Sequence, residues 1–326
     1  MRNGMYQTAR KILIAFALLA ALTAQALGLE LIPGGEAVGL EVEAQGILIA
    51  SVSDRCAAKL KPGDRIFAVD QIPVHTCQQL QDRIAQADGA VALSMDRNGK
   101  RLDLLAPLQP DSGQLGITVR DSLAGVGTVT YIDPSTGAFG ALGHGVTDVD
   151  TGQLLPLDHG SIMDASVKAV KKGERASPGE LKGDFDLTRD SGTLYANTEC
   201  GIFGKLSAED AAKITGAALP IAKKDEVKTG KATILATVSG NETREYDIEI
   251  EKIYSPSGST RNLLLHVTDE ELLAQTGGVV QGMSGSAILQ DGKIVGAVTH
   301  VLVDDPSRGY GIFIENMLSA AGLSSE

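Results

Sequence analysis

A serine framed by glycines near the C-terminal end of the chain is the first candidate for chemistry. Ser284 lies within Gly282–Ser286, after small and apolar residues and before a strand-like stretch, Ala287–Leu289. Glycines let the backbone bend tightly and free neighbouring N–H groups to point at one oxygen. This pattern favours a serine nucleophile in a tight turn. Ser286 is the rival nucleophile, but it falls outside the tight part of the turn.

A histidine between two glycines is the natural partner of such a serine. His144 lies in Leu142–Gly145, and the chain has only 5 histidines. A serine hydroxyl needs a general base, and histidine is the side chain best suited to that role at neutral pH. Ser284 and His144 together predict an acyl-transfer site. We expect His300 to be structural or to line the cleft rather than to act as base, and His75 to lie on the surface.

Composition limits the fold and the class of partner. With 326 residues, 38 glycines and no tryptophan, the chain favours two modest domains built mostly from short strands. The net charge of −12, from 29 basic and 41 acidic residues, argues against a nucleic-acid partner and favours a protein or peptide. Cys56, Cys77 and Cys200 show no metal-binding spacing. We therefore expect no metal and no cofactor, and no disulfide framework, although a Cys56–Cys77 bridge stays open for a protein outside the cytoplasm.

The N-terminal segment has the pattern of an export signal. Basic residues, Arg2 and Arg10-Lys11, precede the apolar run Ile12–Leu22, and Ala24-Gln25-Ala26 follows it. We predict that residues 1–28 are a signal peptide or a membrane anchor. The apolar run is short for a membrane span of about 20 residues, so both alternatives stay open, with cleavage favoured by the Ala-x-Ala pattern.

Residues 29–109 are expected to form a small α+β domain. Strands are predicted at Gly46–Ala50, Arg65–Val69 and Ala90–Met95, with a helix capped by Thr76 before the last of them. The segments Cys56–Ile66 and Val69–Val74 resemble the PDZ domains attached to bacterial proteases.

The PDZ resemblance implies that an extended peptide binds by adding a strand beside a helix. The expected peptide-binding edge consists of Val38, Gly39, Leu40, Glu41 and Val42, although these residues depart from the usual Gly-Leu-Gly-Phe form. The alternative is that this domain only packs against the next one. A breaker-rich join at Pro107–Gly113 places the domain boundary before residue 110.

Residues 110–326 are expected to form one β-rich domain. Gly127–Ile132 alternates like a strand and leads to the His144 loop. A hairpin with one solvated face is predicted from Lys231–Val238 and Arg244–Ile253.

Nearly the whole chain resembles the SpoIVB sporulation peptidases, which combine an N-terminal signal or anchor, a PDZ domain and a serine peptidase domain. The resembling stretches are Gly140–Gly145, Ala176–Gly183, Asn197-Thr198 with Gly201–Gly204, and Thr276–His300. The resemblance implies a trypsin-like double β-barrel with His144 as base and Ser284 as nucleophile. By analogy with the same turn in trypsin-like enzymes, the oxyanion donors are the backbone N–H groups of Gly282 and Ser284. Ala287, where the family commonly has proline, is a minor departure.

A catalytic serine and histidine usually need a third group that holds the imidazole. The resemblance places this acid at Asp269, 15 positions before the serine. Asp148 and Asp158 are rivals. The alternative role for Asp269 is an N-cap of a helix that contains Leu272 and Leu273.

The resemblance implies an exported serine endopeptidase in sporulation signalling. Members of the family act in the space between mother cell and forespore, where they cleave a membrane-bound inhibitor of an intramembrane protease and so activate a late sigma factor. They also process themselves. Two alternatives are kept: a PDZ scaffold whose peptidase site has decayed, and an esterase that uses the same residues.

Overall fold

The computed structural model of the protein describes residues 29–186, 188–254 and 260–323. The predicted signal or anchor, residues 1–28, lies outside the described residues. Within those ranges, no helix is both long enough and apolar enough to cross a membrane.

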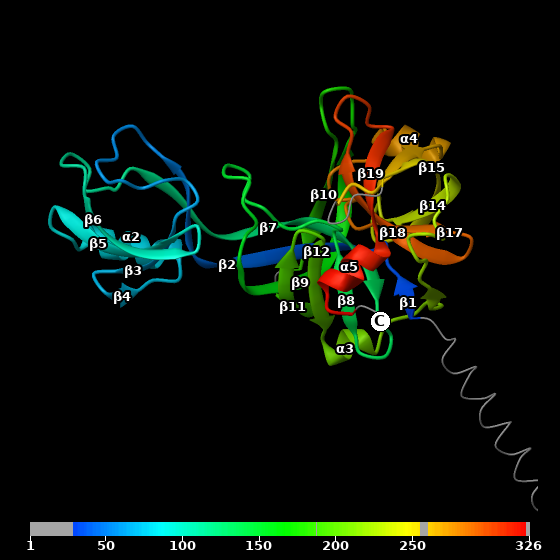
Figure 1. Ribbon diagram of the computed structural model, residues 1–326, viewed down its shortest axis with the longest axis horizontal. Coiled ribbons are helices and arrows are strands. Elements are labelled where there is room, and N and C mark those ends of the chain that lie inside the picture. Colours follow the sequence, from blue (N-terminus) through cyan, green and yellow to red (C-terminus); the bar gives the residue numbers. More distant parts are fainter. Residues whose placement is uncertain (1–28, 187, 255–259, 324–326) are drawn as a thin grey trace, which may run out of the picture.

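Two closed six-stranded β-barrels form the body of the molecule (Figure 1). The first barrel has the order β2-β7-β8-β12-β11-β9 and closes by pairing β7 with β2. Its strands are β2 (Ala37–Val52), β7 (Ile117–Ile132), β8 (Ala138–Ala141), β9 (Leu157–Lys171), β11 (Gly192–Thr198) and β12 (Gly201–Leu206). The predicted mainly β, double-barrel fold is confirmed.

The second barrel has the order β14-β15-β16-β19-β18-β17. Its strands are β14 (Gly230–Ala236), β15 (Arg244–Ile253), β16 (Leu263–Val267), β17 (Ala287–Gln290), β18 (Lys293–Val301) and β19 (Arg308–Phe313). The predicted hairpin is present as β14 and β15. In β15, Tyr246, Ile248 and Ile250 are buried while the residues between them are exposed. Alternate side chains of this strand therefore point into the barrel core, and the others point to solvent.

Shorter elements surround the barrels. They are β1 (Glu30–Pro33), β10 (Glu180–Phe185), β13 (Leu219–Pro220), α3 (Ala208–Ala211), α4 (Glu270–Thr276) and α5 (Ile314–Ala320). The strand β10 extends the edge of β9, and β1 pairs with both β7 and β13.

A small lobe, residues 45–121, projects from the first barrel (Figure 1). It contains β3 (Arg65–Val69), β4 (Ile72–Pro73), α2 (Cys77–Ala85), β5 (Ala90–Arg97) and β6 (Lys100–Pro107). The strands and the helix expected here are present. The Thr76 side chain caps α2 by accepting a hydrogen bond from the Gln79 N–H at 3.2 Å, and Leu80 and Ile84 of this helix are buried against the lobe sheet.

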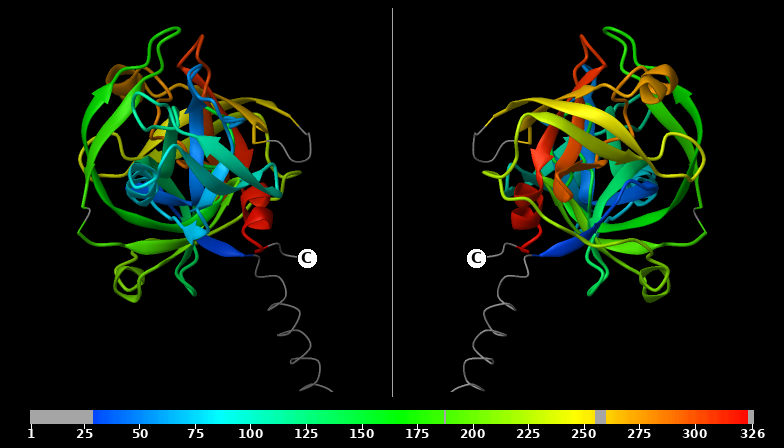
Figure 2. Two further views of the ribbon diagram at one scale, coloured as in Figure 1. Left: turned by 90° about the vertical axis from the view of Figure 1, so that its left-hand side faces the viewer. Right: turned by 90° about the vertical axis from the view of Figure 1, so that its right-hand side faces the viewer.

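The predicted start of this domain at residue 29 is too early. Within β2, Ala37–Glu43 pairs with β7 inside the barrel, whereas Leu48–Val52 pairs with an earlier part of β7 inside the lobe. Leu40 and Val42 belong to the core of the first barrel. The lobe is therefore an insertion between two neighbouring barrel strands, because one continuous strand serves both units. Viewed end-on, it lies in line with the barrels (Figure 2).

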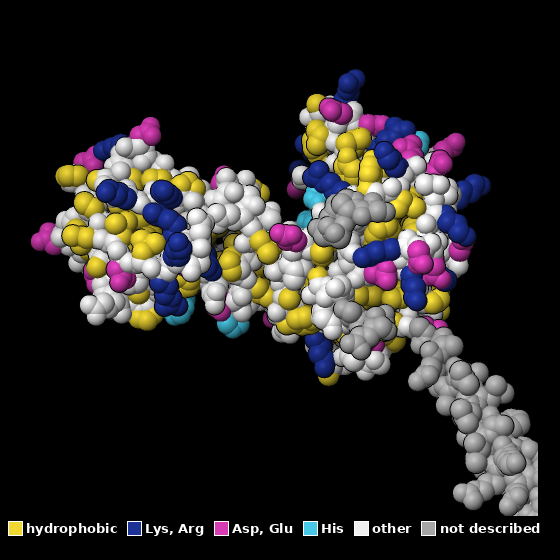
Figure 3. Space-filling model, in the orientation of Figure 1, with side chains coloured by type: hydrophobic (Ala, Val, Ile, Leu, Met, Phe, Trp, Pro, Cys, Tyr) yellow, Lys and Arg dark blue, Asp and Glu magenta, His cyan; other side chains and the backbone are white. Residues whose placement is uncertain are grey.

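The visible face of the lobe carries a group of basic side chains, although the whole chain is acidic (Figure 3). Arg65 and Arg101 both place their guanidinium groups over the Phe67 ring, at 5.5 and 5.6 Å from its centroid. The net charge of the chain thus does not describe this face.

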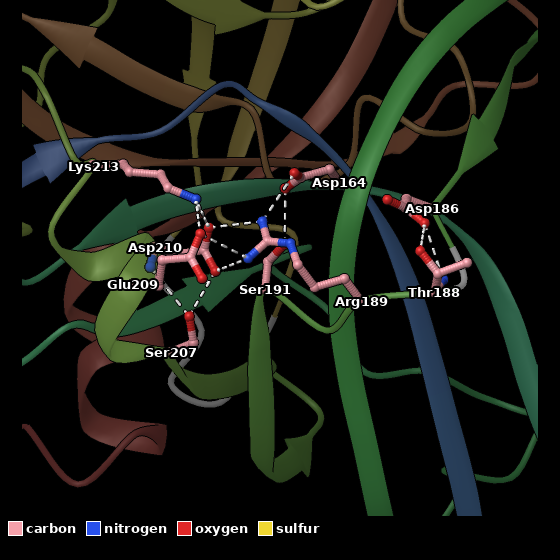
Figure 4. Close-up of polar contacts among 9 residues, drawn as sticks. All are labelled: Asp164, Asp186, Thr188, Arg189, Ser191, Ser207, Glu209, Asp210 and Lys213. Carbon is pink, nitrogen blue, oxygen red and sulfur yellow. Dashed lines mark hydrogen bonds and ion pairs between the residues drawn. The ribbon is translucent and has the colours of Figure 1, made fainter.

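An ion-pair network on the first barrel connects α3 to β9 (Figure 4). Arg189 contacts Asp210 at 2.7 Å and Asp164 of β9 at 3.3 Å, and Lys213 contacts Glu209 at 2.6 Å. Ion pairs at the surface stabilise a fold little, because water and salt screen the charges. These carboxylates are engaged with cations, and we assign them a structural role.

Candidate active site

The Ser284 turn requires its glycines. Gly282 and Gly285 have φ angles of +98° and +102°, which side chains other than glycine rarely adopt. A Cβ atom on Gly285 would lie 2.0 Å from the Thr128 carbonyl oxygen and 2.6 Å from the Leu142 nitrogen. The turn therefore packs directly on backbone atoms of the first barrel.

Thr128 of β7 holds this turn in place. Its N–H donates to the Ser284 carbonyl at 3.2 Å, and its hydroxyl donates to the Gly282 carbonyl at 2.7 Å. Thr128 is only 2% exposed, so these bonds are shielded from water. One residue of the first barrel thus fixes two carbonyl groups of the Ser284 turn.

The expected oxyanion donors have no backbone acceptor among the described residues. The Gln281 carbonyl accepts from the Leu181 N–H at 2.8 Å, and the Met283 carbonyl accepts from the Ser286 N–H at 3.0 Å. In a trans peptide the N–H points away from the carbonyl, so the Gly282 and Ser284 N–H groups point away from these bonds. They are available to bind an oxygen.

The His144 loop is held by the same threonine and presses on the second barrel. After β8 the chain turns at Leu142 and Gly143, whose φ angles are +69° and +67°. The Leu142 N–H donates to the Thr128 carbonyl at 3.2 Å. A Cβ atom on Gly143 would lie 2.9 Å from the Thr299 Cγ2 atom. Gly143 and Gly285 therefore allow the two barrels to approach at the predicted site.

His144 has the tautomer of a general base. Its Nδ1 atom lies 2.9 Å from the Gly145 carbonyl oxygen. A carbonyl can only accept, so Nδ1 carries the proton and Nε2 is left with a free lone pair. Burial lowers the pKa of His144 and the bond to Gly145 partly offsets this. The imidazole is thus neutral near neutral pH and able to accept a proton.

Ser284 and His144 line one cleft between the barrels, with a volume of about 1030 Å³. The Ser284 hydroxyl donates to the Thr299 carbonyl at 2.7 Å, so in this state it does not donate to His144. Catalytic hydrogen bonds are often loose without substrate, and a change of the Ser284 side-chain rotamer breaks the contact with Thr299. Ser286 is 0% exposed, which removes it as a rival nucleophile.

The prediction of Asp269 as the third catalytic residue is wrong in this structure. Its carboxylate accepts from the Leu272 N–H at 2.9 Å and from the Asp247 N–H at 3.4 Å. It is the N-cap of α4, the alternative role, and it does not line the cleft. The spacing of Asp269 from Ser284 could not show whether this residue is a catalytic acid or a helix N-cap.

The two rival acids also have other partners. Asp148 is fully buried, with Arg120 and the Thr151 N–H bound to its carboxylate. Asp158 lies 3.2 Å from His159 on the exposed surface. The group that orients His144 is therefore the Gly145 carbonyl, which sequence reasoning missed because every residue carries a backbone carbonyl.

The predicted peptide-binding edge is also wrong. Val38, Gly39, Leu40, Glu41 and Val42 pair with β7 on one side and with β9 on the other. No backbone edge is left there for a peptide, because both sides of the strand are already hydrogen-bonded.

The open edge of the lobe lies instead at the start of β7. Among the described residues, Ile117–Arg120 pairs only with β2, and α2 lies beside it. The preceding Leu115-Gly116 was the sequence signal that pointed to this strand, since glycine followed by an apolar strand resembles the expected motif more closely than residues 38–42 do.

The family described as SpoIVB peptidase S55 matches residues 111–318. The structure is similar to the inactive form of the Rv3671c protease, with 15% sequence identity, 60% of this chain and 84% of that chain covered, and a TM-score of 0.34. For the active form from M. tuberculosis the values are 15%, 63%, 76% and 0.35. No curated protein matches the chain.

Proposed function

Because the chain belongs to the SpoIVB peptidase S55 family, we propose that it is an exported serine endopeptidase with Ser284 as nucleophile and His144 as general base. The observation that carries the proposal is the meeting of the two loops on Thr128. This residue bonds the Ser284 turn and the His144 loop with its own backbone and hydroxyl. A peptidase acts on a protein substrate, and the 1030 Å³ cleft beside these residues is large enough for several side chains.

Substrate binding is expected along the edge of β18. Among the described residues, His300 and Val301 pair with β19 on one side, while the pairing with β17 ends at Ala297. An extended peptide can add a strand to such an edge. This places its scissile carbonyl next to Ser284.

The reaction follows the acyl-transfer route. The Ser284 hydroxyl attacks the carbonyl carbon and passes its proton to Nε2 of His144, while the Gly282 and Ser284 N–H groups bind the oxyanion. Each such donor contributes about 3 kcal/mol to transition-state stabilisation. His144 then protonates the leaving amine, and water hydrolyses the acyl-enzyme with His144 again as base. The Gly145 carbonyl holds the imidazole, although a neutral acceptor stabilises imidazolium less than a carboxylate does.

Labelling and self-processing test the enzyme assignment. The purified chain is treated with a fluorophosphonate, and its cleavage products are identified by mass spectrometry beside those of Ser284→Ala. We expect the label on Ser284 and self-cleavage only in the wild type. Equal cleavage by Ser284→Ala would refute the assignment.

The physiological role proposed here is cleavage of a membrane-associated regulatory protein during sporulation signalling, together with self-cleavage. The support is the family resemblance and the sequence of residues 1–28, which suits export across, or anchoring to, the cytoplasmic membrane and activity in the intermembrane space of the forespore. The inferred substrate is a membrane-bound inhibitor of an intramembrane protease. Expression of Ser284→Ala in a sporulating host tests this, since activation of the late sigma factor should then fail.

A peptide-binding role of the lobe is the second part of the proposal. The free edge at Ile117–Arg120 beside α2 supports a PDZ-type function for the lobe. Its ligand is expected to be an extended peptide, either part of the substrate or a segment of this chain. Isotope-edited infrared or NMR titration with peptides of the substrate tests whether β7 gains a strand partner.

Two observations favour the alternative of a decayed site. The Ser284 hydroxyl is bonded to the Thr299 carbonyl, and no carboxylate contacts His144 among the described residues. A decayed scaffold should bind peptides at the lobe but leave Ser284 unlabelled by the fluorophosphonate. Hydrolysis of small esters without cleavage of proteins would instead indicate an esterase.

A further inference from the structure

His300 lies beside the catalytic histidine with one ring nitrogen unsatisfied. The centroid of its ring is 5.0 Å from that of His144, and the two planes are tilted by 39°. The side chain lines the same cleft as Ser284. Its Nδ1 atom is buried and has no hydrogen-bond partner among the described residues. Such an atom costs free energy unless a ligand satisfies it.

A guanidinium group lies close to this histidine. Arg261 also lines the cleft, and its guanidinium stacks 5.2 Å from the centroid of the Tyr310 ring. Tyr310 is the cross-strand partner of His300. Burial, together with the nearby His144 and Arg261, lowers the pKa of His300 to about 4. His300 is therefore neutral, in a region of positive potential.

The charges of the cleft are divided between its walls. Arg261 and His300 belong to the second barrel, where β18 offers its open edge. Glu199, the carboxylate that lines the cleft, follows β11 in the first barrel. A substrate strand that pairs with β18 would therefore lie beside Arg261 and His300 rather than beside Glu199.

We propose that His300 and Arg261 form a subsite that binds a glutamate or aspartate side chain of the substrate. On substrate binding the imidazole of His300 turns to bring its Nδ1–H to the cleft, where the carboxylate accepts from it and is attracted by the guanidinium of Arg261. An apolar side chain would leave Nδ1 unsatisfied, and a lysine or arginine would meet a like charge. The inference rests on the proposed function, because it assigns part of the specificity of the same cleft.

Profiling of cleavage sites tests the subsite. The full chain is incubated with a peptide library, and the products are sequenced by mass spectrometry for wild type, His300→Leu, His300→Gln and Arg261→Gln. Lys252→Gln is the matched control, because Lys252 stacks 4.9 Å from the Tyr254 ring in the same barrel but does not line the cleft. We expect at least a tenfold preference for an acidic side chain at one substrate position in the wild type and in Lys252→Gln.

In His300→Leu and Arg261→Gln this preference should fall at least fivefold, whereas His300→Gln, which keeps a donor, should retain part of it. No acidic preference in the wild type, or an unchanged preference in both loss variants, would overturn the subsite. If His300→Leu does not fold, the result for Arg261→Gln alone decides whether the subsite exists, because Arg261 is exposed and its replacement should not disturb folding. Fluorophosphonate labelling of Ser284 separates the two failures: a labelled enzyme without acidic preference loses only the subsite, whereas an unlabelled one loses the peptidase assignment and the subsite with it.

Discussion

Asp269→Ala removes the N-cap of α4 and no contact of His144. The carboxylate accepts from the Leu272 N–H at 2.9 Å and from the Asp247 N–H at 3.4 Å. Loss of an N-cap typically costs about 1 kcal/mol, and the long second bond adds little. Leu272 is fully buried in the core of the second barrel, so the helix cannot move freely to compensate. We expect the free energy of unfolding to fall by about 1–2 kcal/mol.

Activity should change far less than it would for a catalytic acid. Loss of the aspartate of a serine–histidine–aspartate triad lowers kcat by about 10⁴-fold, whereas we expect kcat/KM of Asp269→Ala to stay within about threefold of wild type when the protein is folded. Asparagine caps helices about as well as aspartate. Asp269→Asn is therefore the control, with both stability and activity expected near wild type.

Urea denaturation and steady-state peptide cleavage measure the two effects in the same preparations. The reasoning fails if Asp269→Asn unfolds like the wild type and yet loses 10³-fold or more in kcat. That outcome would mean that the second barrel rearranges on substrate binding and brings the carboxylate to His144.

Three further predictions concern the residues around the two loops. Burial lowers the pKa of His144 below its usual value of 6.5; because the base must be neutral to accept a proton, the acid limb of the kcat/KM profile should lie below pH 6.5, and a limb above it would contradict this assignment. Gly285→Ala should lower the free energy of unfolding by about 2–5 kcal/mol, because it adds both backbone strain and a backbone clash. Gly292 has a φ angle of +73° but open space around it, so Gly292→Ala should lower the free energy of unfolding by the strain alone. Thermal unfolding of both variants measures the difference. Thr128→Val removes the hydroxyl bond to Gly282 at nearly constant shape, so kcat should fall about tenfold as the oxyanion donors loosen, with little change in KM; unchanged kcat would show that Thr128 does not position the turn.

The Ser284 turn and the His144 loop were predictable because glycine leaves a local signal. Few residue types other than glycine adopt a positive φ angle or allow another chain segment to approach closely. Both conditions hold at Gly143, Gly282 and Gly285. The group that orients His144 left no such signal. It is a backbone carbonyl, and Asp269 had the composition expected of either an acid or a cap.

The peptide-binding edge was predicted wrongly for a different reason. Apolar alternation marks strands, but it does not show how many partners a strand has. The 16 residues of β2 read equally well as two strands of one small domain or as one strand that passes from the barrel into the lobe. Only the register with β7 and β9 decides between these arrangements.

The insertion of the lobe has a consequence for how the chain folds. β2 and β7 are antiparallel neighbours in the first barrel, yet about 80 residues separate Glu43 from its partner Ser122. Closing a flexible loop of about 80 residues costs about 3 kcal/mol more in chain entropy than closing a turn of about four. A folded lobe already holds its two ends side by side, since Leu48 pairs with Arg120. The folded lobe thus lowers the entropy cost of pairing β2 with β7 in the barrel that carries His144. A chain whose lobe fails to fold should therefore assemble its cleft slowly, even when every residue of the cleft is intact.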